Sequence, residues 1–241
     1  DHLGMTADAY ILGDIDEVID YVREHNIDCT AVVSNDVIEH IYDMDYYLRK
    51  VPLLSQGALS VAMLTTANML NIKNVKKVMR KQYKQENLGI KLEYGHKQRD
   101  AAGAFLSIRN NIIKEYAPEL AKDIVAQLAR NTRGLIIDDI KAAVDKYRES
   151  GVIIEPIAHP TNTCDPYTGN WCEHLMDPFA LRELLEKQGF RSSIQPGYYY
   201  IDESQGVTEK IIRTVMNLVI RASGRLGLRI APMWMLSAHR P

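Results

Sequence analysis

Residues 29–64 read CTAVVSNDVIEHIYDMDYYLRKVPLLSQGALSVAML and decide the fold class of the chain. The run 29–34 is almost continuously apolar, which is typical of a strand that is buried on both faces of a parallel sheet. Next along the chain, the apolar residues between Tyr42 and Val51 have helical spacing, and residues 58–64 form a second apolar run. A strand, a helix and a strand in this order predict a βαβ unit and therefore an α/β fold.

The same reading extends in both directions. Upstream, residues 9–12 form a short apolar run that ends at Gly13-Asp14, and helical spacing covers 15–25. Downstream, residues 69–150 are polar, helical and poor in strands, with a locally basic stretch from Lys73 to Lys84. After residue 152 the pattern predicts a helix opened by Asp177-Pro178, a strand at 190–194, a helix at 207–224 and a last strand at 229–239.

Composition restricts the function classes. The chain has 241 residues, a net charge of -2, 46% hydrophobic and 25% charged residues, as in an ordinary globular protein. Lys and Arg (29) do not exceed Asp and Glu (31), which argues against a general nucleic-acid partner. No run of about 18 apolar residues occurs, so no membrane span is expected. Three widely spaced cysteines indicate reduced thiols and a cytoplasmic location.

Two segments resemble the class I S-adenosylmethionine-dependent methyltransferases. Residues 32–43 (VVSNDVIEHIYD) are similar to the fourth-strand motif of that family, and Gly13-Asp14 lies upstream at the spacing of its third strand. Gln56-Gly57, with the following strand and Asn68, resembles the fifth strand and its exit loop. Residues 174–190 (HLMDPFALRELLEKQGF) are similar to the helix and turn before the sixth strand. The closing strand fits the seventh, which inserts antiparallel in this family.

This resemblance implies a Rossmann-like class I methyltransferase sheet, mostly parallel with an antiparallel last strand, plus a helical insertion. We expect strands three to five of the family in 1–68, a helical insertion and acceptor lid in 69–151, and the rest of the core in 152–241. The first strands of the family, with the Gly-rich cofactor loop, are missing. Either this sequence is a piece of a longer protein, which the motifs kept downstream favour, or the chain has lost that part. The chain alone is expected to bind S-adenosylmethionine poorly or not at all.

The resemblance assigns the cofactor site to strand ends. Asp14 would contact the adenine amino group with the Ile15 backbone alongside, although Asp14 also fits a helix N-cap. The remaining cofactor candidates follow the fourth strand, where the transferred methyl group would lie: Ser34, Asn35, Asp36, Val37 and His40. Turn and capping chemistry is the alternative role for Asn35 and Asp36.

Three residues are candidates for the catalytic base: His40, Asp36 and His174. Histidine titrates near neutrality and suits this role, whereas a packed histidine that fixes the strand–helix turn is an equally good reading of His40. Candidate contacts to the acceptor are Asn68, His96, Tyr167, Trp171 and His174. The loop from His159 to His174 also holds Cys164 and Cys172, but their separation and the absence of a Cys-x-x-Cys pair do not fit zinc, so no metal is expected.

The sequence therefore predicts methyl transfer from S-adenosylmethionine to a small-molecule or saccharide acceptor, by O-methylation. No nucleic-acid partner is expected, and the oligomeric state is left open. One alternative is another nucleotide-binding α/β enzyme such as a dehydrogenase, although the dinucleotide fingerprint is missing. The other is a non-catalytic binding module with a methyltransferase fold.

Overall fold

The computed structural model of the protein describes residues 7–89 and 103–241, and it has an α/β fold built on a four-stranded mixed sheet. The strands are β1 (Ala31–Asn35), β2 (Leu59–Thr65), β3 (Arg191–Pro196) and β4 (Trp234–Arg240), in the order β1-β2-β4-β3. β1 and β2 are parallel, with Val33 opposite Ala62. β4 lies between β2 and β3 and is antiparallel to both. The expected α/β fold and the antiparallel last strand are therefore confirmed.

The helices follow the predicted spacing closely. α1 (Ile15–Glu24) precedes β1. Between the strands lie η1 (Ile38–His40), α2 (Met44–Lys50), η2 (Val51–Leu54), α3 (Ile72–Leu88), α4 (Phe105–Tyr116), α5 (Lys122–Asn131), α6 (Ile137–Ser150), α7 (Pro178–Lys187), α8 (Val207–Ala222) and η3 (Gly224–Arg229). α7 begins as predicted, because the Asp177 carboxylate accepts from the Phe179 amide at 2.9 Å and Pro178 occupies the first turn. None of the helices in the described ranges is long and apolar enough to cross a membrane.

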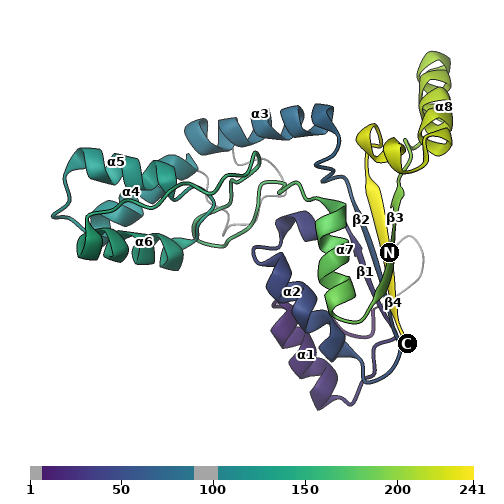
Figure 1. Ribbon diagram of the computed structural model, residues 1–241, viewed down its shortest axis with the longest axis horizontal. Coiled ribbons are helices and arrows are strands. Elements are labelled where there is room, and N and C mark those ends of the chain that lie inside the picture. The colour runs from purple at the N-terminus through teal and green to yellow at the C-terminus, as the bar shows by residue number, and fades with distance from the viewer. Residues whose placement is uncertain (1–6, 90–102) are drawn as a thin grey trace.

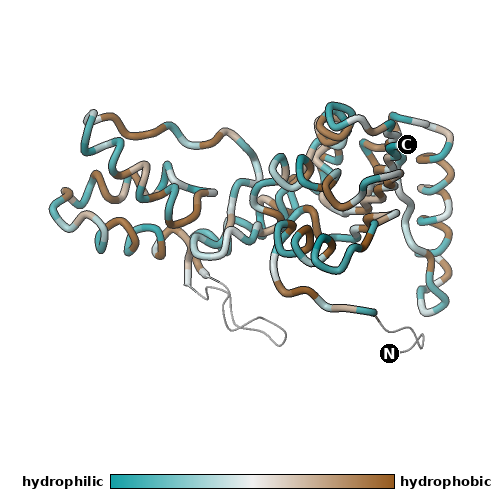
Figure 2. The backbone as a smooth tube through the Cα atoms, turned by 90° about the horizontal axis from the view of Figure 1, so that it is seen from below, coloured by the Kyte–Doolittle hydropathy of each residue, from teal (hydrophilic) through white to brown (hydrophobic). Residues whose placement is uncertain are grey.

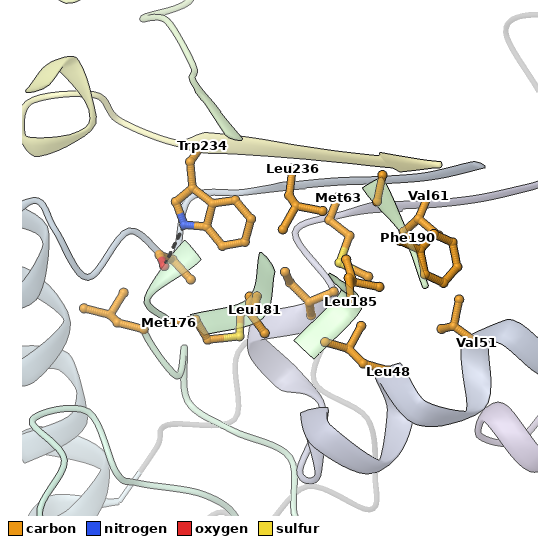
Figure 3. Close-up of a cluster of buried hydrophobic side chains, with 14 of the residues drawn as sticks. Leu48, Val51, Val61, Met63, Met176, Leu181, Leu185, Phe190, Trp234 and Leu236 are labelled. Atoms are coloured by element: carbon orange, nitrogen blue, oxygen red, sulfur yellow. Dashed lines mark hydrogen bonds between the residues drawn. The ribbon is translucent and has the colours of Figure 1, made fainter. Parts of the chain in front are cut away.

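The main hydrophobic core lies against one face of the sheet. Alternate residues of β2 (Leu59, Val61 and Met63) point into it and are at most 1% exposed. Trp234 and Leu236 of β4 lie beside them, as Figure 3 shows, and side chains of α2 and α7 close the layer. The Trp234 indole donates to the Ala67 carbonyl at 3.4 Å, which fixes the chain where it leaves β2. This packing holds the carboxyl ends of β1 and β2 in place.

A second core makes a separate helical lobe. α4, α5 and α6 pack around aliphatic residues such as Ile113, Leu128 and Ile140, which are fully buried. This lobe lies at one end of an elongated molecule, and α3 runs between it and the sheet (Figures 1 and 2). The buried Arg109 of α4 pairs with Glu86 of α3 and donates to the Ala129 carbonyl of α5 at 2.8 Å. That ion pair joins three helices at one buried point.

Three expectations about strands are wrong. Residues 9–12 are not a strand: Tyr10 and Leu12 are about nine-tenths exposed, because no neighbouring strand pairs with them in the described residues. β1 is not buried on both faces, since it lies at the sheet edge and Val33 is 77% exposed. The last strand begins at Trp234 rather than at residue 229, because η3 continues to Arg229 and Pro232 has no amide hydrogen for the sheet.

Candidate functional site

Polar residues gather where the parallel strands β1 and β2 end. Asp36 follows β1 in the left-handed region, with φ at +49°, and its amide donates to the Leu64 carbonyl at 2.9 Å. Its carboxylate accepts from the Thr66 amide at 2.8 Å. Asp36 therefore joins the ends of two strands that lie thirty residues apart in the sequence, and its side chain is exposed at this edge.

Glu39 lies directly below this edge and is buried. Its side chain accepts a hydrogen bond from the Thr65 hydroxyl at 2.9 Å, and only 2% of the residue is exposed. Burial raises the pKa of this carboxyl above its ordinary value, and the nearby Asp36 charge acts in the same direction. A carboxyl with a raised pKa at the carboxyl edge of a sheet is the kind of group that functional sites use.

The loop 159–176 lies along the same edge. The His174 amide donates to the Glu39 carbonyl at 3.0 Å, and the Met176 amide donates to the Ala67 carbonyl at 3.2 Å. Asn68 and Met176 form a short parallel bridge. Residues far from β1 and β2 in sequence are therefore held against the ends of these strands, among them the predicted acceptor contacts Trp171 and His174.

Four rings stack in a row across this loop. Tyr42 stacks on Trp171 with ring centroids 5.5 Å apart, Trp171 lies 4.4 Å from His174, and His174 stacks on His159 at 4.1 Å. The Trp171 indole donates to the Tyr42 carbonyl at 3.2 Å. These contacts order the loop between the sheet edge and the helical lobe.

His40 has a defined tautomer at this site. Its Nδ1 lies 2.7 Å from the Trp171 carbonyl oxygen, which only accepts hydrogen bonds, so Nδ1 carries the hydrogen. In the neutral ring Nε2 then holds the lone pair. The residue is exposed, so this nitrogen can accept a proton from a group bound at the edge.

His174 is also fixed through Nδ1 but has a different character. Its Nδ1 donates to the Thr161 carbonyl at 3.0 Å, and burial lowers its pKa to about 4, with the neighbouring His159 adding to the shift. Burial also lowers the pKa of His159. Both rings of this stacked pair are therefore neutral at neutral pH. A ring with so low a pKa is a weak base, so among the two histidines His40 is the better candidate for proton transfer.

Helix α3 anchors the loop from the other side. The buried Gln82 amide donates to the carbonyls of Thr161 at 3.3 Å and Cys172 at 2.7 Å. Lys81 pairs with Glu173, also on the loop. Beside these anchors, a shallow open groove of about 530 Å³ is lined by basic residues of one face of α3: Lys73, Lys76, Lys77, Arg80, Lys81 and Lys84. The basic stretch of the sequence therefore adjoins the loop.

The remaining cofactor candidates differ in what their side chains do. Asp14 is the N-cap of α1 and forms a capping box with Glu17, so its carboxylate accepts from the Asp16 amide at 2.8 Å. Ile15 is buried in the first turn of α1. Ser34 is buried at the end of β1, and its hydroxyl has no hydrogen-bond partner in the described structure. Asn35 and Val37 are exposed on either side of Asp36.

Two of the predicted acceptor contacts, Asn68 and Tyr167, lie outside the ring stack. The amide of Asn68 is fully buried and donates to the carbonyls of Leu228 at 2.7 Å and Ala231 at 3.1 Å, so it holds η3 against the end of β2. Tyr167 is 55% exposed on the turn 165–169 and takes no part in the ring stack. His96 lies outside the described residues, so its predicted role stays a prediction.

Sequence reasoning missed Glu39 and His159 as parts of this site. Glu39 belongs to the Val-Ile-Glu-His motif, but nothing in that motif shows which way a short helical turn directs it. His159 meets His174 fifteen residues later, and only the folded loop brings the two rings together. Within the described ranges, no group of three His, Cys, Asp or Glu side chains is close enough to hold a metal ion.

Comparisons of this chain with protein-family models, with curated proteins and with solved structures find no match in any of the three.

Proposed function

We propose that the protein is a methyltransferase of the class I S-adenosylmethionine-dependent type, acting at the carboxyl edge of β1 and β2. The observation that carries the proposal is the position of β4, which lies between β2 and β3 and is antiparallel to both. The sequence resemblance expects this arrangement of its last strand. The motif residues Asp36 and His40 are gathered at the strand ends, where α/β proteins bind their ligands.

The residues at this edge fit part of a cofactor site. The exposed Asn35 and Asp36 would flank a bound cofactor, whereas the unpartnered hydroxyl of Ser34 is buried beneath them. When bound, S-adenosylmethionine supplies a methyl group on a positively charged sulfur, which carboxylates and oxygen dipoles favour. Asp14 is occupied as a helix cap, so its contact to adenine would have to use the remaining lone pairs of the carboxylate.

The resemblance also says what would lie beside β1. In the described residues no strand pairs with the outer side of β1. The family places its central strand and Gly-rich loop beside the strand that β1 resembles. A strand added at this edge would bring such a loop next to Asn35 and Asp36.

His40 would act as the base. Its Nδ1 hydrogen is held by the Trp171 carbonyl, and Nε2 would take the proton of an acceptor hydroxyl. A bound S-adenosylmethionine would supply the methyl group to that oxygen, and its sulfur–methyl bond would break to leave S-adenosylhomocysteine. The 159–176 loop keeps the ring in this orientation through the Trp171 carbonyl. A hydroxyl acceptor of small size, such as a saccharide, suits a site formed by strand ends and one ordered loop.

A mass-spectrometric assay of methyl transfer to a panel of hydroxylated small molecules and saccharides tests this function. Protein from the complete reading frame should form a methylated product. His40→Gln should lower turnover by about 100-fold or more, because a positioned base contributes roughly that much. His239→Gln, an exposed histidine on β4, is the matched control and should keep the activity.

The assay separates methyl transfer from a non-catalytic binding role. Equal turnover of the His40→Gln variant and the control would contradict the role of His40. No methylated product from any acceptor, with S-adenosylhomocysteine still bound, would favour the binding module.

A further inference from the structure

Helix α8 has a reversed amphipathic arrangement. The side that faces the rest of the chain is polar: Asn217 forms two hydrogen bonds with the backbone of Tyr199, at 2.8 and 2.9 Å, and Arg213 donates to the Tyr200 carbonyl at 2.6 Å. Ile220 is the one residue of α8 that is buried. A surface helix normally turns its apolar stripe toward the protein, so an uncovered stripe needs another partner.

The opposite side of α8 carries aliphatic side chains that are exposed to solvent. Val207, Ile211, Val215 and Leu218 fall within about 80° of one another around a helix of 3.6 residues per turn. The face as a whole consists of aliphatic residues that are 45–75% exposed: Val207, Ile211, Ile212, Val215, Leu218 and Val219. In Figure 1, α8 projects from the end of the sheet, and the exposure of these side chains shows that no element of the described ranges covers the face.

The segment formed by α8 and η3 carries mostly positive charge. Residues 207–229 contain five cations and a single carboxylate, Glu209, which pairs with Arg213 at 2.5 Å. Arg221, Arg225 and Arg229 are exposed and have no acidic partner among the described residues. Two exposed tyrosines, Tyr198 and Tyr200, lie in the segment that leads into the helix. The whole chain has a net charge of -2, so this excess of cations is local.

We propose that α8 lies on an anionic lipid bilayer, with its aliphatic face in the interface and its arginines among the headgroups. Aliphatic side chains, a cationic rim and tyrosines are the features of helices that lie in the plane of a membrane. A second copy of the chain fits less well, because it carries the same local excess of positive charge, whereas an anionic bilayer carries the opposite charge. The helix lies on the membrane and does not cross it, in agreement with its length and composition.

Vesicle co-sedimentation tests the proposal and needs neither cofactor nor acceptor. The full chain should bind vesicles of phosphatidylcholine mixed with phosphatidylglycerol, and bind vesicles of phosphatidylcholine alone weakly. Binding to the mixed vesicles should fall as salt is added. Leu218→Glu should lower the partition coefficient by about tenfold or more. The change replaces an aliphatic side chain that would enter the bilayer by a negative charge that anionic lipid repels. Arg221→Glu with Arg225→Glu should lower it by at least fivefold per position.

Val152→Glu is the matched control, because Val152 is 60% exposed after α6 and lies outside α8. It should bind as the unmodified chain does. Circular dichroism should show the same fold for all variants, since the substituted side chains are exposed. Equal vesicle binding by Leu218→Glu and Val152→Glu would overturn the proposal. The proposal would also be overturned if the chain bound no vesicles and formed a dimer in sedimentation velocity that Leu218→Glu dissociates. The aliphatic face would then be assigned to a second copy of the chain.

Discussion

His174 shows most clearly how burial changes chemistry at this edge. Its ring lies between Trp171 and His159, and its Nδ1 donates to the Thr161 carbonyl, so a second proton would place a charge in a stacked and desolvated group. Its pKa of about 4 lies below the ordinary histidine value of about 6.5. At a pH between these two values, His174 binds a proton in the unfolded chain but stays neutral in the folded chain.

This difference predicts a loss of stability in mild acid. Because the folded pKa is depressed, His174 makes no difference above about pH 7, and the fold loses stability as the pH falls from about 6.5 to about 4. From pH 7 to pH 5 the loss from this residue should be about 2 kcal/mol. Urea unfolding at both pH values measures it. His174→Gln should flatten the pH dependence, and an unchanged slope in this variant would contradict the account.

The residue scale was the least predictable from sequence. Asp36 and His40 were found because they belong to a local motif, whereas their partners Thr66 and Trp171 lie far along the chain. The burial of Glu39 and the meeting of His159 with His174 depend on how the 159–176 loop is held. No local pattern encodes such long-range contacts, so the type of residue could be predicted and its environment could not.

At the scale of elements, Asn68 fastens the exit of β2 to the segment before β4. Its amide nitrogen donates to the carbonyls of Leu228 and Ala231, and its oxygen accepts from the Leu70 amide at 3.0 Å. The two bonds to the carbonyls are buried and the bond from the Leu70 amide is partly buried, so removal of the side chain would leave buried groups without a partner.

Replacement of this residue should therefore destabilise the fold strongly. Asn68→Ala is expected to cost about 3 kcal/mol or more, because each buried group left unsatisfied costs roughly 1–3 kcal/mol. Urea unfolding measures the free energy of unfolding of Asn68→Ala and of a control, Asn87→Ala. The control removes one exposed hydrogen bond to the Tyr83 carbonyl. Equal stability of the two variants would show that the Asn68 bonds contribute little.

Element type was more predictable than residue environment. Apolar runs at 29–34, 58–64 and 190–194 became β1, β2 and β3 with shifts of one or two residues, because strand patterning is local. The run 9–12 has the same pattern but no neighbouring strand in the described structure, so pattern alone was not enough. β4 was predicted five residues too long at its start, since a 3-10 turn and Pro232 interrupt the apolar sequence there.

At the scale of the whole molecule, the buried pair of Arg109 and Glu86 connects the helical lobe to α3 and so to the site loop. Arg109 is fully buried, and Glu86 accepts from both of its terminal nitrogens. Desolvated charges are costly when one partner is removed and much less so when both are replaced by apolar groups.

A double-mutant cycle should reveal this coupling. Arg109→Met alone should lower the free energy of unfolding by about 3–5 kcal/mol, because Glu86 would be left buried without its partner. Adding Glu86→Met should recover most of that loss. Urea unfolding of the two single variants and the double variant measures the coupling, and additive losses would contradict it.

The central claim is a cofactor site at the carboxyl edge of β1 and β2. Isothermal titration with S-adenosylhomocysteine of the protein expressed from its whole gene is the most direct test of this claim. The account predicts a saturable heat of binding. It also predicts weaker binding for Asn35→Ala, at the end of β1, and unchanged binding for Asn87→Ala on α3. No heat at high ligand concentration would contradict a cofactor site at the carboxyl edge of β1 and β2.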